Sequence, residues 1–222
     1  SLTDTDLSNA AFPFCAAREI AIGFARVLCV RITYLGELGY ELYIPTEQAL
    51  HVYDRLVAAG EPLGLVHAGL NALASLRVEK AYRDYGHDID NTDSVLEAGL
   101  GFAVDLKKPG GFLGREAVLA KKAAGPLRRR LAQILVKDPQ PLLFHAEVVH
   151  RDGKPAGYVR AASYGHTLGG AVGLVMVEGG EHAVDEAYLS QATWEVDIAG
   201  RRYPAVLSLR PLYDPEMKRI KS

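Results

Sequence analysis

The spacing of apolar positions changes along the chain, and each change marks a predicted element. Apolar and β-branched residues fill positions 24–34, and apolar residues alternate with polar ones over 40–44 before Pro45. Both patterns are typical of strands, and the two glycines between them predict a hairpin with a tight connection. From Thr46, a candidate N-cap, to Gly60 the spacing becomes that of a helix.

A second helical pattern runs from about Ala68 to Arg83, and a short helix is predicted at 112–118, entered through Gly114. Two strands and two helices make the first part of the chain an α+β unit. Residues 121–130 then contain mainly Lys, Ala, Gly, Pro and Arg, which is typical of a connector. We therefore expect one domain over residues 1–124 and a second over 125–222.

Beyond the connector, short apolar runs alternate with turn pairs such as Asp152-Gly153 and Gly179-Gly180. This pattern predicts an all-β domain, either a barrel or a sandwich. The apolar runs lie at 131–136, 147–149, 157–159, 171–177, 193–198 and 203–209.

Composition narrows the class of protein. With 49% hydrophobic and 23% charged residues, the chain has the composition of a globular protein. A formal net charge of −2 does not favour nucleic-acid binding, and no apolar run reaches the roughly 18–20 residues that span a membrane. Cys15 and Cys29 lie among apolar residues, which favours a reducing compartment. The start of the chain has no signal-peptide pattern. Because it does not begin with Met, we expect either a trimmed chain or a domain cut from a longer polypeptide.

Signatures of common enzyme classes are missing from the sequence. There is no phosphate loop, dinucleotide fingerprint, Gly-x-Ser-x-Gly or His-Glu-x-x-His motif. The seven histidines are scattered, and no cysteine or carboxylate cluster completes a metal site. The basic residues at 121–130 are interpreted as a solvated junction, with a dock for an anionic partner or ligand tail as the alternative.

Two stretches carry a family resemblance. They read Tyr34-Leu-Gly-Glu-Leu-Gly-Tyr-Glu41 and Leu76-Arg-Val-Glu-Lys-Ala-Tyr-Arg-Asp-Tyr-Gly-His-Asp-Ile89. Both resemble glycine-cleavage T-protein and the related C-terminal modules of sarcosine and dimethylglycine dehydrogenases, and further similar segments extend the match over nearly the whole chain. Residues 6–14 and the terminal Tyr213-Asp-Pro segment are closer to the dehydrogenase-linked branch. The resemblance implies a T-protein-like α+β fold, with a partial ferredoxin-like α/β unit followed by a C-terminal all-β barrel.

The same resemblance implies that the chain binds tetrahydrofolate. It assigns Glu41 to the pteridine edge of folate and places Tyr34 beside the ring, near its reactive nitrogen. The chemistry suits this role, because the pteridine edge presents adjacent N–H donors and an ionised carboxylate accepts two such bonds. The alternative from pattern alone is that Glu41 faces solvent and Tyr34 packs in the core.

Four further residues are candidates for ligand contact. Arg77 lies among apolar residues of the second helix, where a charge needs a partner, and either Glu79 or the ligand supplies one. Tyr82 and Tyr85, at the predicted end of that helix, are expected either to flank the cofactor's rings or to pack in the core. Arg219 is a candidate for the anionic tail of folate, with an exposed terminal charge as the alternative.

The implied activity is that of an aminomethyltransferase, and it is expected of the full-length parent. A one-carbon unit passes from a small amine to the N5 nitrogen of tetrahydrofolate, delivered by an upstream flavin site or a lipoyl carrier protein. FAD, if used, would be bound outside this chain, and the implied location is the bacterial cytoplasm or the mitochondrial matrix. The catalytic residue is not identified here, because the family's catalytic Asp belongs to a preceding segment with no counterpart in this chain.

Two other functions are weighed. Family members usually carry Arg-Asp where this chain has Ala74-Ser75, which leaves open a non-catalytic regulatory subunit resembling the pyruvate dehydrogenase phosphatase regulatory protein. A folate-dependent iron–sulfur assembly protein of the same superfamily is disfavoured, because its Lys-Gly-Cys-Tyr-x-Gly-Gln-Glu signature is absent.

Overall fold

The computed structural model describes residues 2–222, and the chain forms two compact units. The first contains the residues up to Leu73 together with Glu216–Ser222, and the second contains Ala74–Pro215. The division falls within helix α2 (Leu70–Glu79), and the connector at 121–130 lies inside the second unit. The division into domains at 124 and 125 therefore stays a prediction about the family module and does not describe these compact units.

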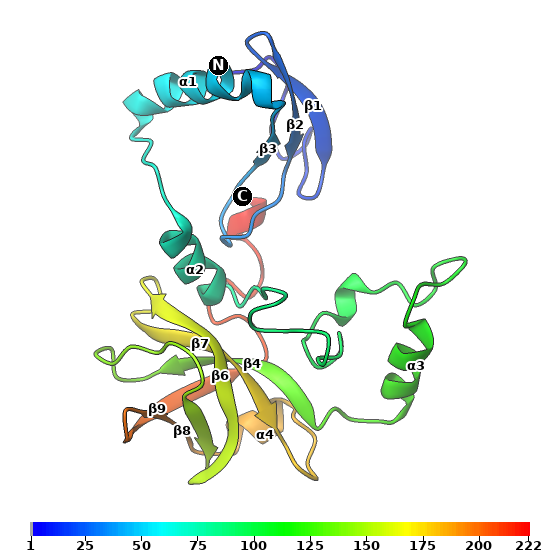
Figure 1. The fold of residues 1–222 in the computed structure, drawn as a ribbon, viewed down its shortest axis with the longest axis vertical. Coiled ribbons are helices and arrows are strands. Elements are labelled where there is room, and N and C mark those ends of the chain that lie inside the picture. Colours follow the sequence, from blue (N-terminus) through cyan, green and yellow to red (C-terminus); the bar gives the residue numbers. More distant parts are fainter. Residues whose placement is uncertain (1) are drawn as a thin grey trace. The chain divides into compact units, whose positions relative to one another are not determined.

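The first unit is built on an antiparallel sheet in the order β1-β2-β3. Its strands are β1 (Ala17–Ile22), β2 (Ala25–Val30) and β3 (Glu41–Tyr43). Helix α1 (Ala49–Gly60) lies along one face of this sheet (Figure 1). That face carries the core of the unit, whose fully buried side chains are Phe12, Ile20, Ile22, Ala25, Val27, Cys29 and Val52.

The sequence-based prediction for this unit was right in outline and wrong in detail. Strand β1 was missed, and residues 31–40 form a longer connection than the tight hairpin turn that was predicted between β2 and β3. Thr46 is not a helix N-cap, since it belongs to a 3₁₀ turn at Thr46–Gln48 that leads into α1 without a side-chain capping bond. The end of α1 at Gly60 is confirmed.

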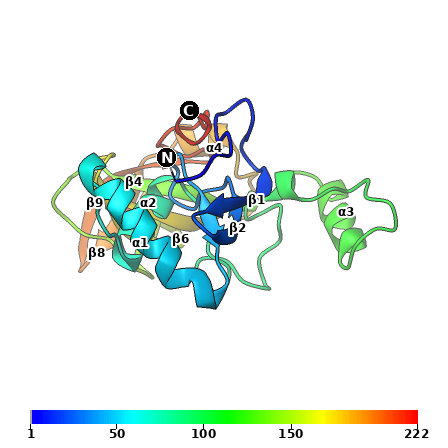
Figure 2. The ribbon, with the colours of Figure 1, turned by 90° about the horizontal axis from the view of Figure 1, so that it is seen from above.

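Helix α2 ends at Glu79, earlier than predicted, because the backbone reverses its hand at Ala81. The φ angle of Ala81 is 55°, and the N–H of Tyr82 donates to the carbonyl of Arg77 at 2.8 Å, a pattern that closes helices. Helix α3 (Arg115–Ala123) is entered through Gly114, as expected, but it extends beyond the predicted 112–118 into the connector. Gly114 has a φ of 87° that favours glycine. In two views at right angles, the α3 segment stands apart from the barrel of its unit (Figures 1 and 2).

The predicted all-β region is confirmed as a closed barrel with the strand order β4-β7-β6-β5-β8-β9. Asp152 and Gly153, with φ of 49° and 79°, form the tight turn between β5 and β6. The short helix α4 (Glu186–Ser190), which was not predicted, lies between β7 and β8. The strands are β4 (Arg129–Val136), β5 (Val148–Arg151), β6 (Lys154–Gly165), β7 (Gly170–Glu178), β8 (Trp194–Ile198) and β9 (Arg201–Ser208).

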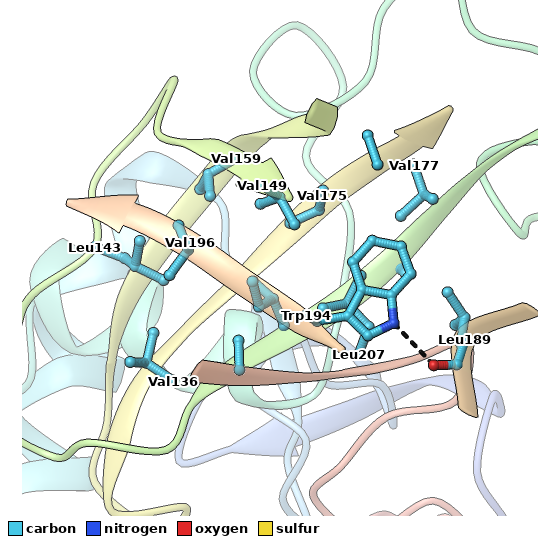
Figure 3. Packing of buried hydrophobic residues seen from close by; sticks show 14 of the residues in the cluster. Val136, Leu143, Val149, Val159, Val175, Val177, Leu189, Trp194, Val196 and Leu207 are labelled. Carbon is cyan, nitrogen blue, oxygen red and sulfur yellow. Dashed lines mark hydrogen bonds between the residues drawn. The ribbon is translucent and has the colours of Figure 1, made fainter. Parts of the chain in front are cut away.

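The barrel interior is filled by branched aliphatic side chains and one tryptophan (Figure 3). The indole N–H of Trp194 donates to the carbonyl of Leu189 at 2.8 Å, so its one polar atom is satisfied inside the core. Strands β6 and β7 approach closely at Gly157, where a Cβ atom would collide with the carbonyl oxygen of Met176. Across residues 2–222, no helix is long and apolar enough to cross a membrane.

Candidate functional site

The face of the β1-β2-β3 sheet opposite its core carries Glu41. Alternation along β3 turns Leu42 toward the core and leaves Glu41 and Tyr43 on the other face. Cross-strand pairing sets Tyr43 opposite Leu28 and Glu41 opposite Val30, so a carboxylate and a phenol lie beside two apolar side chains. Tyr43 is 55% exposed and Leu28 is 42% exposed, whereas Glu41 is half-buried. This surface, which we call the open sheet face, combines a negative charge with apolar area.

Tyr43 holds the Glu41 carboxylate. Its hydroxyl donates to Oε2 of Glu41 at 2.8 Å, which leaves Oε1 as an acceptor without a bond from Tyr43. The hydrogen bond to the carboxylate, together with the negative charge beside it, raises the pKa of Tyr43 above its ordinary value. Tyr43 therefore stays a neutral donor at physiological pH, and the position of the carboxylate is defined within the strand.

Tyr34 lies in the same unit, in the connection that leads from β2 to β3. The structure describes it as half-buried and does not place it in the hydrophobic core of the unit. Its neighbour Thr33 accepts the N–H of Leu35 at 3.0 Å through its side-chain hydroxyl, a local bond that shapes the connection. Tyr34 thus lies within the connection that ends where Glu41 begins β3.

In the second unit, Arg77 is buried and paired, but with Asp88 and not with Glu79 as the sequence suggested. One guanidinium N–H group donates to Oδ2 of Asp88 at 2.7 Å and also to the carbonyl of Tyr82 at 3.0 Å. Asp88, with none of its surface exposed, also accepts the N–H of Asp84 at 2.9 Å. The ion pair therefore fixes the backbone between Tyr82 and Asp88.

Glu79 has a separate structural role. Its Oε1 accepts the backbone N–H groups of Thr167 and Leu168 at 2.8 and 2.9 Å, which connects the end of α2 to the β6–β7 turn. Gln133 of β4 donates to the carbonyl groups of Val78 and Glu79 at 2.7 and 2.9 Å. These bonds anchor the end of α2 to the barrel of the same unit.

Tyr82 and Tyr85 do not lie on the helix, as was predicted, because α2 ends before them. Tyr82 is half-buried, and Tyr85 is 73% exposed beside a short bridge to Ile89. Neither tyrosine belongs to the unit's hydrophobic clusters of buried residues. Both lie on the segment whose backbone the Arg77–Asp88 pair holds.

Sequence reasoning missed Tyr43 and Asp88. Tyr43 follows Glu41 by two residues on a predicted strand, so the alternation already placed both on one face. Asp88 was passed over because its partner is eleven positions away on the other side of a chain reversal. Arg219 lies at the exposed start of a 3₁₀ turn at Arg219–Lys221. Within residues 2–222, no group of three or more potential metal ligands comes together.

The architecture, an α/β unit joined in sequence to a closed six-stranded barrel, defines a class for which a solved relative exists. The glycine cleavage system aminomethyltransferase T from Bartonella henselae has the same fold, with a TM-score of 0.73 and 23% sequence identity over 89% of this chain and 52% of that one. The model of the GCVT N-terminal domain matches residues 1–108, and that of the glycine cleavage T-protein C-terminal barrel domain matches residues 129–214. The chain belongs to the glycine cleavage T-protein family.

Several relatives in this family are much longer proteins. A 4-methylaminobutanoate oxidase (formaldehyde-forming) from Paenarthrobacter nicotinovorans is 45% identical over 91% of this chain and 23% of its own length. Mitochondrial sarcosine dehydrogenase from Mus musculus is 38% identical over 98% of this chain and 24% of its own length. A mitochondrial pyruvate dehydrogenase phosphatase regulatory subunit from Mus musculus is 35% identical over 90% of the chain and 24% of its own length. The chain thus spans about a quarter of these relatives.

Proposed function

We propose that this chain is a tetrahydrofolate-binding aminomethyltransferase module, and that its parent transfers a one-carbon unit from a small amine to tetrahydrofolate. The observation that carries the proposal is the Glu41 carboxylate, half-buried on the open sheet face and held by the Tyr43 hydroxyl at 2.8 Å. Membership of the T-protein family supports the same role.

The residues present suit a pterin. Its edge carries adjacent N–H donors, and the Glu41 carboxylate is an acceptor with apolar Leu28 and Val30 on the neighbouring strand to receive a flat ring. Glu41 would hold the pterin edge and Tyr34 would lie beside the ring. Tyr82 and Tyr85 keep their assignment as candidate ring contacts, which rests on the resemblance.

Arg77 is better explained as a positioning residue than as a ligand contact. Its guanidinium is already engaged by Asp88 and by the carbonyl of Tyr82, and both its side chain and that of Asp88 are buried. It would act on the cofactor through Tyr82, whose backbone it holds. Arg219 remains a candidate for the carboxylates of the folate tail, on charge alone.

Bound tetrahydrofolate supplies the nitrogen nucleophile that accepts the one-carbon unit. The residues of this chain would bind and orient it, and orientation of two reactants can lower a barrier by about 7–11 kcal/mol. The carboxylate of Glu41 would set the register of the ring, and the neutral Tyr43 would keep that carboxylate in place. We assign no proton-transfer role to any residue of this chain.

The names of the relatives support a finer proposal for the parent. The oxidase, the sarcosine dehydrogenase and a mitochondrial dimethylglycine dehydrogenase point to a small secondary or tertiary amine as substrate. A flavin domain outside this chain would be its oxidant. A lipoyl carrier protein is the alternative donor. Mitochondrial relatives favour the matrix in a eukaryote, and a bacterial aminomethyltransferase favours the cytoplasm in a bacterium.

A non-catalytic regulatory subunit is the second candidate. It is favoured by the regulatory relative and by Ala74-Ser75, which stand where family members usually carry Arg-Asp. Ser75 has a structural role here, since its hydroxyl donates to the carbonyl of Tyr164 at 2.6 Å. A regulatory role would predict that the Glu41 carboxylate can be removed without any effect on folate binding.

Calorimetric titration of tetrahydrofolate into the 222-residue chain tests the proposal. Glu41→Gln removes the charge that accepts the pterin donors, so we expect the Kd to rise by about tenfold or more. The matched control is Glu19→Gln, which removes the same charge from the same sheet face, because Glu19 is paired with Leu28 across the strands. The control should bind like the wild type.

Two outcomes would overturn the proposal. One is the absence of saturable tetrahydrofolate binding by a folded wild-type chain, which would favour the regulatory candidate. The other is an equal loss of affinity in Glu41→Gln and Glu19→Gln, which would mean that only the general charge of the sheet matters. Far-ultraviolet circular dichroism of each variant checks that the chain has folded.

A further inference from the structure

The basic residues around the connector at 121–130 fall into two groups that the sequence alone does not separate. Most of them are paired with carboxylates, at distances from 2.7 to 3.7 Å. The pairs are Lys121–Glu97, Arg128–Glu181, Arg129–Asp93, Arg129–Glu97 and Arg129–Glu178. Within residues 2–222, Lys122 and Arg130 have no carboxylate at ion-pair distance, so their positive charges are not compensated locally.

These two unpaired cations line the same cleft. It has a volume of about 440 Å³ and lies entirely within the second unit. Lys122 comes from the last turn of α3 and Arg130 from the start of β4, and three leucines supply apolar walls. The leucines are Leu96, Leu106 and Leu127, each half-buried.

Arg130 is only partly satisfied by the protein. One terminal N–H group donates to the carbonyl of Val184 at 3.2 Å, while the Nε group is buried without an acceptor. A guanidinium has five N–H donors and prefers carboxylate or phosphate partners in a fork. A half-buried guanidinium with one carbonyl partner therefore favours an anion that the protein itself does not provide.

In a neighbouring cleft, carboxylates of the chain lie beside the basic side chains. This cleft is lined by Lys121, Arg128 and Arg129, but also by Glu97 and Glu178, so carboxylates of the chain offset two of its three positive charges. In the cleft of Lys122 and Arg130, no acidic side chain is among the lining residues. The two clefts thus differ in net charge although they share one connector.

We propose that the cleft formed by Lys122, Arg130 and the three leucines binds a small organic carboxylate. The carboxylate would lie at the two cations, and an apolar body would pack against the leucine side chains. A volume of about 440 Å³ falls in the range of about 300–1,000 Å³ that small-molecule sites occupy. None of the residues that line this cleft is a proposed pterin contact, and its test does not depend on tetrahydrofolate.

The experiment compares 4-phenylbutyrate with its uncharged amide, which has the same apolar body. Each is titrated into the 222-residue chain, with binding followed by shifts of backbone amide signals in NMR spectra. We expect the carboxylate to saturate shifts in residues 96–106 and 122–130, and the amide to bind at least about tenfold more weakly.

Matched variants separate a built site from general basic charge. Arg130→Gln and Lys122→Gln should each weaken the binding of 4-phenylbutyrate by about threefold to tenfold, since each removes one charged donor. Arg128→Gln, a change of the same kind at an exposed, paired neighbour, should leave the affinity unchanged. Lys122 is exposed, so its variant tests the proposal even if Arg130→Gln does not fold.

Three results would overturn the proposal. They are equal binding of acid and amide, an equal loss in Arg128→Gln, and no saturable shift in this cleft at millimolar probe. In the last case the cations would be solvated surface charges. Fluorescence of Trp194, the single tryptophan of the chain, monitors the fold of the barrel in every variant.

Discussion

The barrel of the second unit and the sheet of the first use their strands in different ways. Closure pairs all six barrel strands in one ring, and their inward side chains fill an apolar interior. The three-stranded sheet has a core on one face only, and its other face leaves Leu28, Glu41 and Tyr43 accessible to different degrees. This difference indicates that the barrel strands serve mainly the packed core, while the open sheet face presents side chains to solvent.

The same contrast appears in the ion pairs. Arg77–Asp88 in the second unit joins side chains that are 6% and 0% exposed, whereas Arg26–Glu19 on the sheet joins side chains that are 77% and 62% exposed. A buried charge that loses its partner is strongly destabilising, but an exposed pair contributes little. Burial, and not the presence of an ion pair, therefore decides what each pair contributes.

The largest expected loss of stability comes from breaking the buried ion pair between Arg77 and Asp88. Arg77→Met leaves the Asp88 carboxylate buried without its cation, and we expect the free energy of unfolding to fall by about 3–5 kcal/mol. Arg26→Met on the sheet should change it by less than about 1 kcal/mol. Urea unfolding followed by circular dichroism and by Trp194 fluorescence measures both variants.

The double variant Arg77→Met with Asp88→Asn sharpens this comparison. Removing both charges should recover part of the lost stability, because no uncompensated carboxylate remains. If Arg77→Met and Arg26→Met proved equally mild, burial would not distinguish the two pairs, and the positioning role of Arg77 would lose its physical basis.

The next effect concerns two leucines in strands. Leu207 of β9 is 8% exposed in the barrel core, and Leu28 of β2 is 42% exposed on the open sheet face. We expect Leu207→Ala to lower the free energy of unfolding by about 2–5 kcal/mol, since it creates a cavity. Leu28→Ala should cost less than about 1 kcal/mol because that side chain already contacts solvent.

Leu28→Ala is also informative for binding. If the open sheet face receives the pterin ring, this variant should bind tetrahydrofolate more weakly, although its free energy of unfolding stays close to that of the wild type. A variant of Leu28 that lost stability as severely as Leu207→Ala would instead indicate that this face is covered by protein, which would contradict the contrast between the two regions.

The smallest expected effect is a change in the pKa of Tyr43 on the open sheet face. The hydrogen bond and negative charge of Glu41 raise the pKa of Tyr43 above the ordinary value of 10.0. A raised folded-state pKa means that the stabilisation is fully present below pH 10 and is lost as the pH rises through the folded-state value. Glu41→Gln removes the charge, so Tyr43 should then titrate at lower pH.

The titration is measured by NMR of ¹³C-labelled tyrosine, with the Tyr43 signal assigned from its loss in Tyr43→Phe. An unchanged midpoint in Glu41→Gln would show that the two side chains are not coupled in solution.

Much of the architecture was predictable from periodicity. The six barrel strands were recognised because short apolar runs alternate with turn pairs such as Asp152-Gly153, and these are local signals. The predicted start of α3 at Gly114 and end of α1 at Gly60 were right for the same reason. Strand β1 was missed because polar residues interrupt its short apolar pattern at Arg18 and Glu19.

The candidate site was predictable only in part. The motif from Tyr34 to Glu41 indicated a folate contact by resemblance, but the sequence did not indicate which side chain would hold the carboxylate. The structure identifies Tyr43, and it shows that Asp88, not Glu79, balances Arg77. The early end of α2 depends on Ala81, an alanine in a left-handed conformation that helix propensity does not anticipate.

The sequence by itself determined the six barrel strands, most of the other elements and the family, because periodicity, turn residues and motifs are carried by neighbouring positions. Only the tertiary structure decided that the barrel closes, that Asp88 meets Arg77, and that Lys122 and Arg130 share a cleft without a carboxylate. The physical reason is that compensation of a buried or clustered charge depends on distance in space, and chain reversals bring together groups that sequence spacing keeps apart.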